Sequence, residues 1–112
     1  MIDNYEFGEI MVDGKIYLAD LIILPGEIMG NWWRLEGHKL QLEDLKLVLD
    51  KDIEALVVGT GYFGMVKVVE LVVKVLKDRE IELIVLDTRE ACQIYNRLSA
   101  LRKTAAALHL TC

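Results

Sequence analysis

The N-terminal part of the chain shows the two-residue alternation that is typical of β-strands. Apolar side chains occupy alternate positions here: Ile10, Val12, Ile16 and Leu18. Asp13-Gly14 lies between the two halves of this pattern and suits the positive φ angles of a two-residue hairpin turn. Residues 21–24 are wholly apolar and are followed by Pro25-Gly26. We therefore predict an N-terminal β-hairpin, a third strand at 21–24, and a loop after it.

The middle of the chain changes to helical spacing and then to a buried strand. Leu42, Leu45 and Leu49 fall on one face of a short predicted helix. Residues 55–58 are apolar and bounded by glycine, as a strand buried on both faces should be. The valine-rich segment beyond that glycine predicts a helix, because its polar residues recur at spacings of three and four. These polar residues are Lys67, Glu70, Lys74 and Lys77.

The C-terminal part continues the alternation of strands and helices. Residues 82–86 read as a strand, which completes a β-α-β unit with the strand at 55–58. A long helix is expected from Asp87-Thr88, since both residues are suitable N-caps and Glu90 matches a capping-box partner. Residues 105–110 supply a final strand. The sum predicts a three-layer α/β domain around a mixed central sheet, with the hairpin as an addition.

Length and charge narrow the possible classes of protein. The 112 residues make one domain, 1–112, large enough for a core without disulfides. A net charge of −5 opposes general attraction to nucleic acid or to anionic membranes, so we expect neither as a partner. Cys92 and Cys112 are too far apart for a disulfide framework, and no zinc-type spacing is present. Acidic Asp3 and Glu6 stand where a signal peptide needs basic residues, which indicates a cytoplasmic protein.

The most informative motif is the glycine turn at residues 59–64, which fits the spacing G-x-G-x-x-G. Glycines allow the backbone to approach an anion, and N–H groups at a following helix start favour negative charge. The turn at Asp87-Thr88 should lie beside it, because parallel strands end at one sheet edge. Gly59, Thr60, Gly61, Asp87 and Thr88 then form a candidate crevice for a phosphate or carboxylate group. A purely structural role for the glycines stays open, since tight turns need them too.

A nicotinamide or flavin cofactor is not expected in that crevice. Asp87 does stand at the distance, about 20 residues on, where a ribose-binding acid is found. The domain is nevertheless too small for a second mononucleotide-binding half, and Tyr62 and Phe63 are bulky beside the turn. We therefore expect no cofactor and no metal ion.

Acid–base chemistry supplies the alternative to a binding protein. His38 could act as a general base near neutral pH, especially beside Asp20 or Asp87. A loop histidine that caps or packs beside Trp33 is the simpler explanation, and His109 in an apolar strand should be a satisfied core or edge residue. Cys92 follows core-facing Ala91 and is expected to be a buried thiol rather than a nucleophile.

Four further residues are candidates for binding. Asn96 lies at the margin of the apolar face of its helix, and Arg102 would lie under that face if the helix extended so far. Arg102 could bind an anion or simply stabilise the helix C-terminus. Trp32 and Trp33 are candidates for a partner surface, because aromatic pairs are common at interaction hot spots, although we expect at least one to cover the core.

Several motifs together resemble a known family. They are A-L-V-V-G-T-G at 55–61, Thr88-x-x-Ala91-Cys92-x-x-Tyr95-Asn96-x-Leu98, Arg102 with the run Ala105-Ala106-Ala107-Leu108, Tyr17-x-x-Asp20, Trp33 and Gly37-His38. The resemblance is to a small single-domain family of unknown function that includes the adipogenesis-associated protein and a mitochondrial complex I assembly factor. It covers nearly the whole chain and implies a three-layer α/β fold with a mixed sheet, but no agreed activity, substrate or cofactor.

These observations favour a cytoplasmic binding or assembly-type protein. Its partner would be another protein or a small anion held in the crevice between the two turns. The alternative is a small enzyme that uses Asp20, His38 or Asp87 in the same crevice. The resemblance lowers the expectation of oxidoreductase chemistry and, by analogy only, favours an assembly role.

Overall fold

A mixed five-stranded sheet forms the centre of the molecule. The computed structural model describes all residues from Met1 to Cys112. The strand order is β5 (Glu27–Met29), β4 (Leu21–Leu24), β10 (Thr104–Leu108), β7 (Ala55–Gly59) and β9 (Glu82–Leu86). The strands β10, β7 and β9 run parallel, whereas β4 and β5 are antiparallel to their neighbours. The predicted mixed sheet is confirmed.

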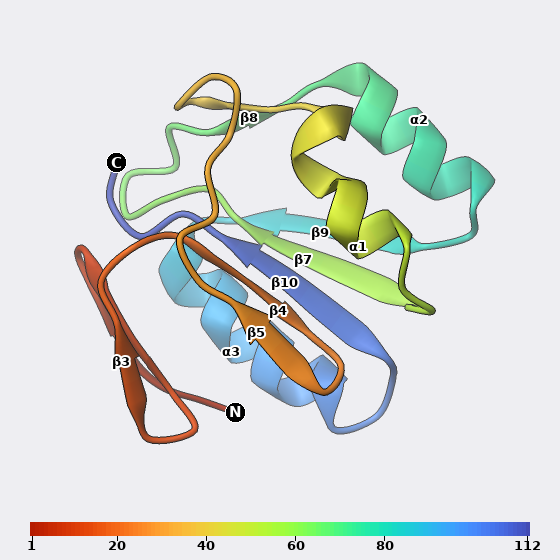
Figure 1. Cartoon of the computed structure of the whole chain (residues 1–112). Helices are drawn as coiled ribbons and strands as arrows, with labels where there is room; N and C mark the ends of the chain where they lie inside the picture. Colours follow the sequence, from red (N-terminus) through yellow and green to blue (C-terminus); the bar gives the residue numbers. More distant parts are fainter.

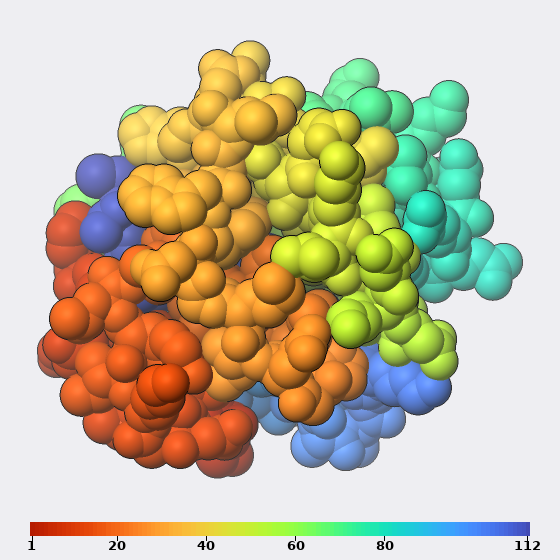
Figure 2. All heavy atoms as spheres, in the orientation of Figure 1, coloured from red at the N-terminus to blue at the C-terminus, as the bar shows by residue number.

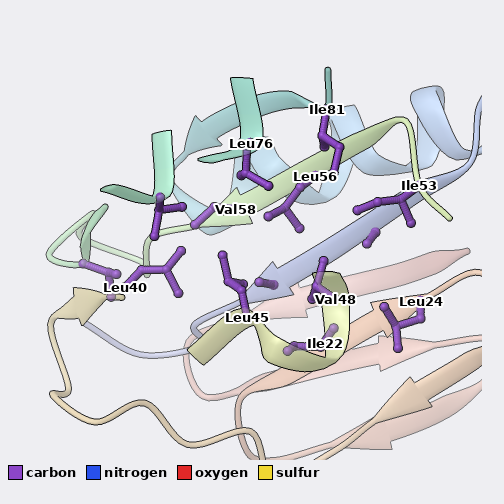
Figure 3. Packing of buried hydrophobic residues seen from close by; sticks show 14 residues of the cluster. Ile22, Leu24, Leu40, Leu45, Val48, Ile53, Leu56, Val58, Leu76 and Ile81 are labelled. Carbon is purple, nitrogen blue, oxygen red and sulfur yellow. The ribbon is translucent and has the colours of Figure 1, made fainter. Parts of the chain in front are cut away.

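Helices cover both faces of this sheet and give the predicted three layers. The α-helices α1 (Lys46–Leu49) and α2 (Glu70–Asp78) lie on one side, and α3 (Thr88–Ser99) lies on the other (Figure 1). Alternate residues of the central strands therefore enter different cores. Leu56 and Val58 belong to the core under α1 and α2, while Val57 belongs to the core under α3. Figure 3 shows the first core, where side chains of β4, β7, α1 and α2 converge.

The central strand β10 is built from small residues because it is covered on both faces. Ala105, Ala106 and Ala107 are completely buried between the two cores. Their small side chains leave room for the larger residues of the neighbouring strands. In Figure 2, atoms of the segment between β4 and α1 cover the near face, so little of the central strands is visible.

The N-terminal hairpin is present and forms part of a separate three-stranded sheet. The strands β2 (Glu9–Val12) and β3 (Lys15–Tyr17) pair antiparallel around Asp13-Gly14, which has the positive φ angles that this turn requires. The first strand, β1 (Ile2–Glu6), was not predicted, and it pairs with β2. Its buried Ile2 joins the core under α3. The three-stranded sheet thus covers one side of that core.

Two short segments differ from the sequence-based prediction because each pairs with another strand. The expected loop after Pro25 contains the strand β5, which is held by β4. Lys67, expected in a helix, lies in β8 (Lys67–Val68), which pairs in parallel with β6 (Lys39–Leu40). The predicted helix at 42–49 begins as the 3₁₀ turn η1 (Leu42–Leu45) and continues as α1. None of the helices has the length and apolar character needed to cross a bilayer.

Candidate functional site

The three parallel strands end together, and this edge of the sheet is the candidate site. Gly59 of β7 lies in register with Leu86 of β9 and with Leu108 of β10. The glycine turn, the start of α3 and the residues after β10 therefore leave the sheet side by side. Figure 1 shows the C-terminus next to the turn that follows β7.

Thr88 links these three segments through its hydroxyl group. Its Oγ1 accepts a hydrogen bond from the Gly61 N–H at 2.8 Å and donates one to the His109 carbonyl oxygen at 2.6 Å. The Thr88 N–H also donates to the Gly61 carbonyl oxygen at 3.1 Å. A Cβ atom at Gly59 would lie only 2.8 Å from Thr88 Oγ1. The buried threonine thus requires glycine on the facing strand.

The glycine turn is bound by the chain itself. Backbone N–H groups in and just after the turn donate hydrogen bonds to oxygen atoms of this protein. The donors belong to Thr60, Gly61, Tyr62, Gly64, Met65 and Val66. Two of the acceptors are the backbone oxygens of Thr111 and Cys112. Gly61 has a φ of +110°, and a Cβ atom there would lie 2.3 Å from the carbonyl carbon of Cys112. An anion at this turn would have to displace the segment 109–112.

The glycine turn does not lead directly into a helix, although the sequence pattern indicates that it should. After the glycine turn the chain first forms β8, and α2 begins only at Glu70. Positive φ angles at Gly61 and Gly64 fold the turn back, and β8 then pairs with β6. Helix α3, in contrast, begins directly after β9, where Asp87 is the predicted N-cap and its Oδ1 accepts the Glu90 N–H at 3.0 Å.

Asn96 and Arg102 lie away from this edge. The side-chain amide of Asn96 bonds to both the N–H and the carbonyl oxygen of Ile2, each at 2.8 Å, and so fastens β1 to α3. Arg102 precedes β10 and therefore lies at the opposite edge of the sheet, where it pairs with Glu82 and donates to the Glu54 carbonyl oxygen. It also lines an open surface groove of about 980 Å³. Its charge there is already neutralised by Glu82.

A buried charged cluster lies beside the segment 109–112; it consists of Asp20, Arg34 and His109, here called the Asp20 cluster. Asp20 Oδ2 lies 2.9 Å from Arg34 Nη1 and 2.7 Å from His109 Nδ1. Its Oδ1 accepts the Leu110 N–H at 2.8 Å. Burial alone would raise the pKa of the Asp20 carboxyl group, but the hydrogen bonds from His109, Leu110 and Arg34 outweigh it and lower that pKa.

The Nδ1 atom of His109 lies between the two charged partners, 2.7 Å from Asp20 Oδ2 and 3.0 Å from Arg34 Nη2. A protonated Nδ1 donates to the carboxylate, whereas an unprotonated Nδ1 accepts from the guanidinium group. Nε2 faces Thr111 Oγ1 at 3.4 Å. His109 is buried and has polar partners, as was predicted for it. Asp20 therefore pairs with His109, while exposed His38 only places its ring 6.1 Å from that of His109.

Arg34 was not identified from the sequence, although its neighbours were. Its side chain is only 5% exposed, and its Nε and Nη2 atoms both donate to the Gly37 carbonyl oxygen. Trp33 and Gly37-His38, which contribute to the family resemblance, flank these contacts. A single arginine in a polar loop carries no local signal of burial, because its partners Asp20 and His109 are distant in sequence.

The two tryptophans have different environments. Trp32 packs against the core under α1, donates from Nε1 to the Asp44 carbonyl oxygen at 3.0 Å, and stacks on Arg34. It provides the core cover that was expected of at least one tryptophan. Trp33 is 83% exposed. Of the two indoles, only that of Trp33 is therefore largely exposed to solvent.

An exposed aromatic cluster projects from the same edge; it consists of Tyr5, Phe7, Tyr62 and Phe63. Neighbouring ring centroids lie between 5.0 and 6.5 Å apart. Phe7 is 51% exposed and Phe63 is 68% exposed. Arg89 stacks over the Tyr62 ring and donates to its hydroxyl group at 2.8 Å. The glycine turn thus displays two aromatic side chains.

Comparison with known proteins identifies relatives along nearly the whole chain. Residues 2–109 match the family model described as a protein of unknown function (DUF498/DUF598). The NADH dehydrogenase [ubiquinone] 1 alpha subcomplex assembly factor 3 of Danio rerio is 33% identical over 110 residues. The match covers 96% of this chain but only 62% of that relative, so the chain spans less than two thirds of its length.

Solved structures share the fold. A conserved hypothetical protein from Pyrococcus horikoshii OT3 is 31% identical, with a TM-score of 0.85 over 100% of this chain and 99% of that one. A protein from Bartonella henselae, described as an outer membrane protein, is 26% identical, with a TM-score of 0.82 over 98% of this chain and 93% of that one. The three-layer arrangement is therefore common to proteins with different descriptions.

Replacing Asp20 by Asn should lower the free energy of unfolding by about 3–5 kcal/mol, because the change leaves the buried Arg34 without its carboxylate. The folded pKa of Asp20 lies below its unfolded value of about 3.9, so the stabilisation is present above that pH and declines as the pH falls through the folded pKa. Urea unfolding at several pH values measures both effects. The exposed Asp50→Asn change is the control and should leave stability nearly unchanged. A loss as small as that of Asp50→Asn would contradict the role of the cluster.

Phosphate, sulfate and small carboxylates should give no larger change in Tm than chloride at equal ionic strength. The reason is that the N–H groups of Thr60, Gly61, Tyr62 and Gly64 in the glycine turn are already bonded within the chain. Thermal unfolding with an anion series tests this expectation. A bound anion at a hundredfold excess over its Kd would add about 2.7 kcal/mol, and an increase of that size would support the anion-binding hypothesis instead.

Cys92 should resist thiol reagents in the folded protein. Burial, together with the nearby charge of Asp87, raises the pKa of its thiol to about 12. At about pH 8 only about one in ten thousand such groups is ionised, whereas Cys112 is exposed. Ellman's reagent should label Cys112 at once and Cys92 only after unfolding. Rapid labelling of the folded Cys112→Ser variant would show that Cys92 is accessible.

Proposed function

Since the chain belongs to the DUF498/DUF598 family of proteins of unknown function, we propose that it acts by binding a partner protein, in the manner of an assembly factor. Membership confirms the family resemblance that the sequence motifs indicated. The aromatic cluster carries the proposal, because its Phe7 and Phe63 side chains are more than half exposed at the candidate site.

The exposure of the cluster supports a protein contact. Large apolar side chains that gather on a surface mark interaction sites, and aromatic residues dominate binding energy at such sites. Phe7, Phe63 and the neighbouring Met65 are all about half exposed or more. Tyr62 adds a ring, and Arg89 lies against it. This combination of aromatic rings and arginine is typical of the centre of a protein interface.

The backbone around the cluster is firmly held, which lowers the entropic cost of binding. The Tyr62 and Met65 N–H groups donate to the Thr111 and Cys112 oxygens. On the other side, the Gly8 N–H donates to the Leu110 carbonyl oxygen at 2.8 Å and fixes the turn that carries Phe7. In this proposal Gly59, Gly61 and Thr88 serve binding indirectly, because they shape the turn that presents Tyr62 and Phe63.

The described role of a relative agrees with a protein partner. The Danio rerio relative is named as an assembly factor, and it is a longer protein than this chain. Trp33 provides a second exposed anchor, on the loop whose Arg34 contacts His109 of the segment 109–112. A cytoplasmic location is part of the proposal, since both cysteines are unpaired, as is usual in reducing compartments.

Site-specific photo-crosslinking in native cells tests the proposed surface. A photoreactive amino acid at position 63 should capture one protein species, because Phe63 projects from the cluster. The matched control is position 47, since Leu47 is an exposed apolar residue on α1, and it should not capture that species.

The variant Phe63→Ser then measures the contribution of the ring. Binding of the captured partner should weaken by ~30-fold, the effect of a hot-spot residue. The Tm should not fall, because the side chain is mostly exposed. Equal capture from positions 63 and 47, or unchanged affinity of Phe63→Ser, would refute this surface.

A further inference from the structure

The outer edge of β9 is a second surface that no part of the chain covers. A strand at a sheet edge exposes backbone N–H and C=O groups that can pair with another strand, and proteins usually protect such edges. Strand β9 is the last of the five-stranded sheet and pairs with β7 alone. Its five residues make it longer than the opposite edge strand β5, which has three.

The other edges of the fold carry protective features. Strand β5 is short and follows Pro25-Gly26, and β3 begins with the charged residue Lys15. The pairing of β1 with β2 is irregular between Ile2 and Asn4, and Asn96 bonds to both backbone groups of Ile2. Each of these edges is therefore poorly suited to pairing with another strand.

The hydrogen-bond pattern shows which groups of β9 face outward. The Glu82 N–H donates to the Glu54 carbonyl oxygen, and the Leu86 carbonyl oxygen accepts the Thr60 N–H. Glu82, Ile84 and Leu86 thus direct their backbone groups toward β7. The intervening Leu83 and Val85 direct theirs away from the sheet.

The side chains of β9 lack the usual features that oppose pairing. The strand reads Glu-Leu-Ile-Val-Leu and contains no proline, glycine or lysine. Its one charge, Glu82, is at the first position. Val85 is 42% exposed, although it is a β-branched residue that suits a sheet interior.

We propose that two copies of this chain pair their β9 strands antiparallel across a two-fold axis at Ile84. Leu83 of one copy then faces Val85 of the other, and their N–H and C=O groups satisfy each other. Ile84 faces Ile84 of the second copy. The two central sheets become one continuous sheet of both copies.

This register favours a second copy over an unrelated strand because the edge complements itself. Every pairing in the middle of the strand joins two apolar side chains. Glu82 faces Leu86 of the other copy, so the two carboxylates do not stand opposite each other, where like charges destabilise. A two-fold interface uses the same residues from both copies, as most homodimers do.

Sedimentation velocity over about a hundredfold range of protein concentration tests the dimer, with residue-resolved hydrogen exchange by NMR as the second measurement. The dimer mass should appear as concentration rises. In the dimer the Leu83 and Val85 amides should exchange slowly, whereas in the monomer only the Glu82, Ile84 and Leu86 amides of the strand are hydrogen-bonded to the neighbouring segment. A sample of mixed isotope labelling should give an Hα–Hα contact between Ile84 residues of the two copies.

Two variants show which edge strand forms the dimer. Val85→Lys places a charge on the outer edge of β9 and should weaken the dimer by roughly tenfold or more. The matched control is Ile16→Lys on β3, since Ile16 is also an exposed apolar residue, 50% exposed, on an edge strand. This control should dimerise like the unchanged chain. Circular dichroism of both variants establishes that they are folded.

Three results would overturn the proposal. The first is a monomer at every concentration with rapid exchange at Leu83 and Val85. The second is a dimer that Val85→Lys leaves intact, because another surface would then carry it. The third is equal weakening by Ile16→Lys. The test is independent of the proposed partner surface, since Phe63→Ser should leave this dimer unchanged.

Discussion

The buried hydroxyl group of Thr88 is the interaction on which the candidate site depends. It accepts from the backbone after β7 and donates to the backbone after β10, while its own residue begins α3. An apolar side chain here would leave a buried N–H and a buried carbonyl without partners, each at a cost of about 1–3 kcal/mol. The close approach of Gly59 and Gly61 follows from this bond, since a Cβ at either position would collide with Thr88 or Cys112. The segments that follow β7 and β10 therefore pack closely around the Thr88 side chain.

This close packing gives the glycine spacing a different meaning. In a phosphate-binding turn the N–H groups face a ligand and a helix begins at once. Here the N–H groups face the protein, and a short strand precedes the helix. The turn holds Tyr62 and Phe63 at the surface while the segment 109–112 occupies its inner side. The conformational freedom of glycine suits both a turn that binds phosphate and a turn that packs against another segment of the chain. The G-x-G-x-x-G spacing alone therefore does not distinguish these two roles.

On the other side of the candidate site, buried charged side chains connect three segments of the chain. The Asp20 cluster joins the end of the hairpin sheet, the loop of Trp33 and the segment after β10. The Asp20 carboxylate contacts the Arg34 side chain, the His109 ring and the Leu110 N–H. These contacts compensate for the removal of the charged groups from water. Because each partner comes from a different part of the chain, no local pattern indicates the cluster. His38, the candidate general base of the alternative enzyme hypothesis, is exposed, and its ring lies 6.1 Å from that of His109.

The sequence alone determined the elements whose residues carry their own periodicity. The strands at 21–24 and 82–86, the helix that Asp87 caps, and the hairpin around Asp13-Gly14 follow from apolar spacing and turn chemistry, which act over a few residues. Tertiary structure decided the remainder. It made Lys67 part of a strand, buried Arg34, and filled the inner side of the glycine turn with residues about fifty positions later in the chain. Those outcomes depend on hydrogen bonds and charges between distant segments, and such contacts exist only after the sheet has brought its strand ends together.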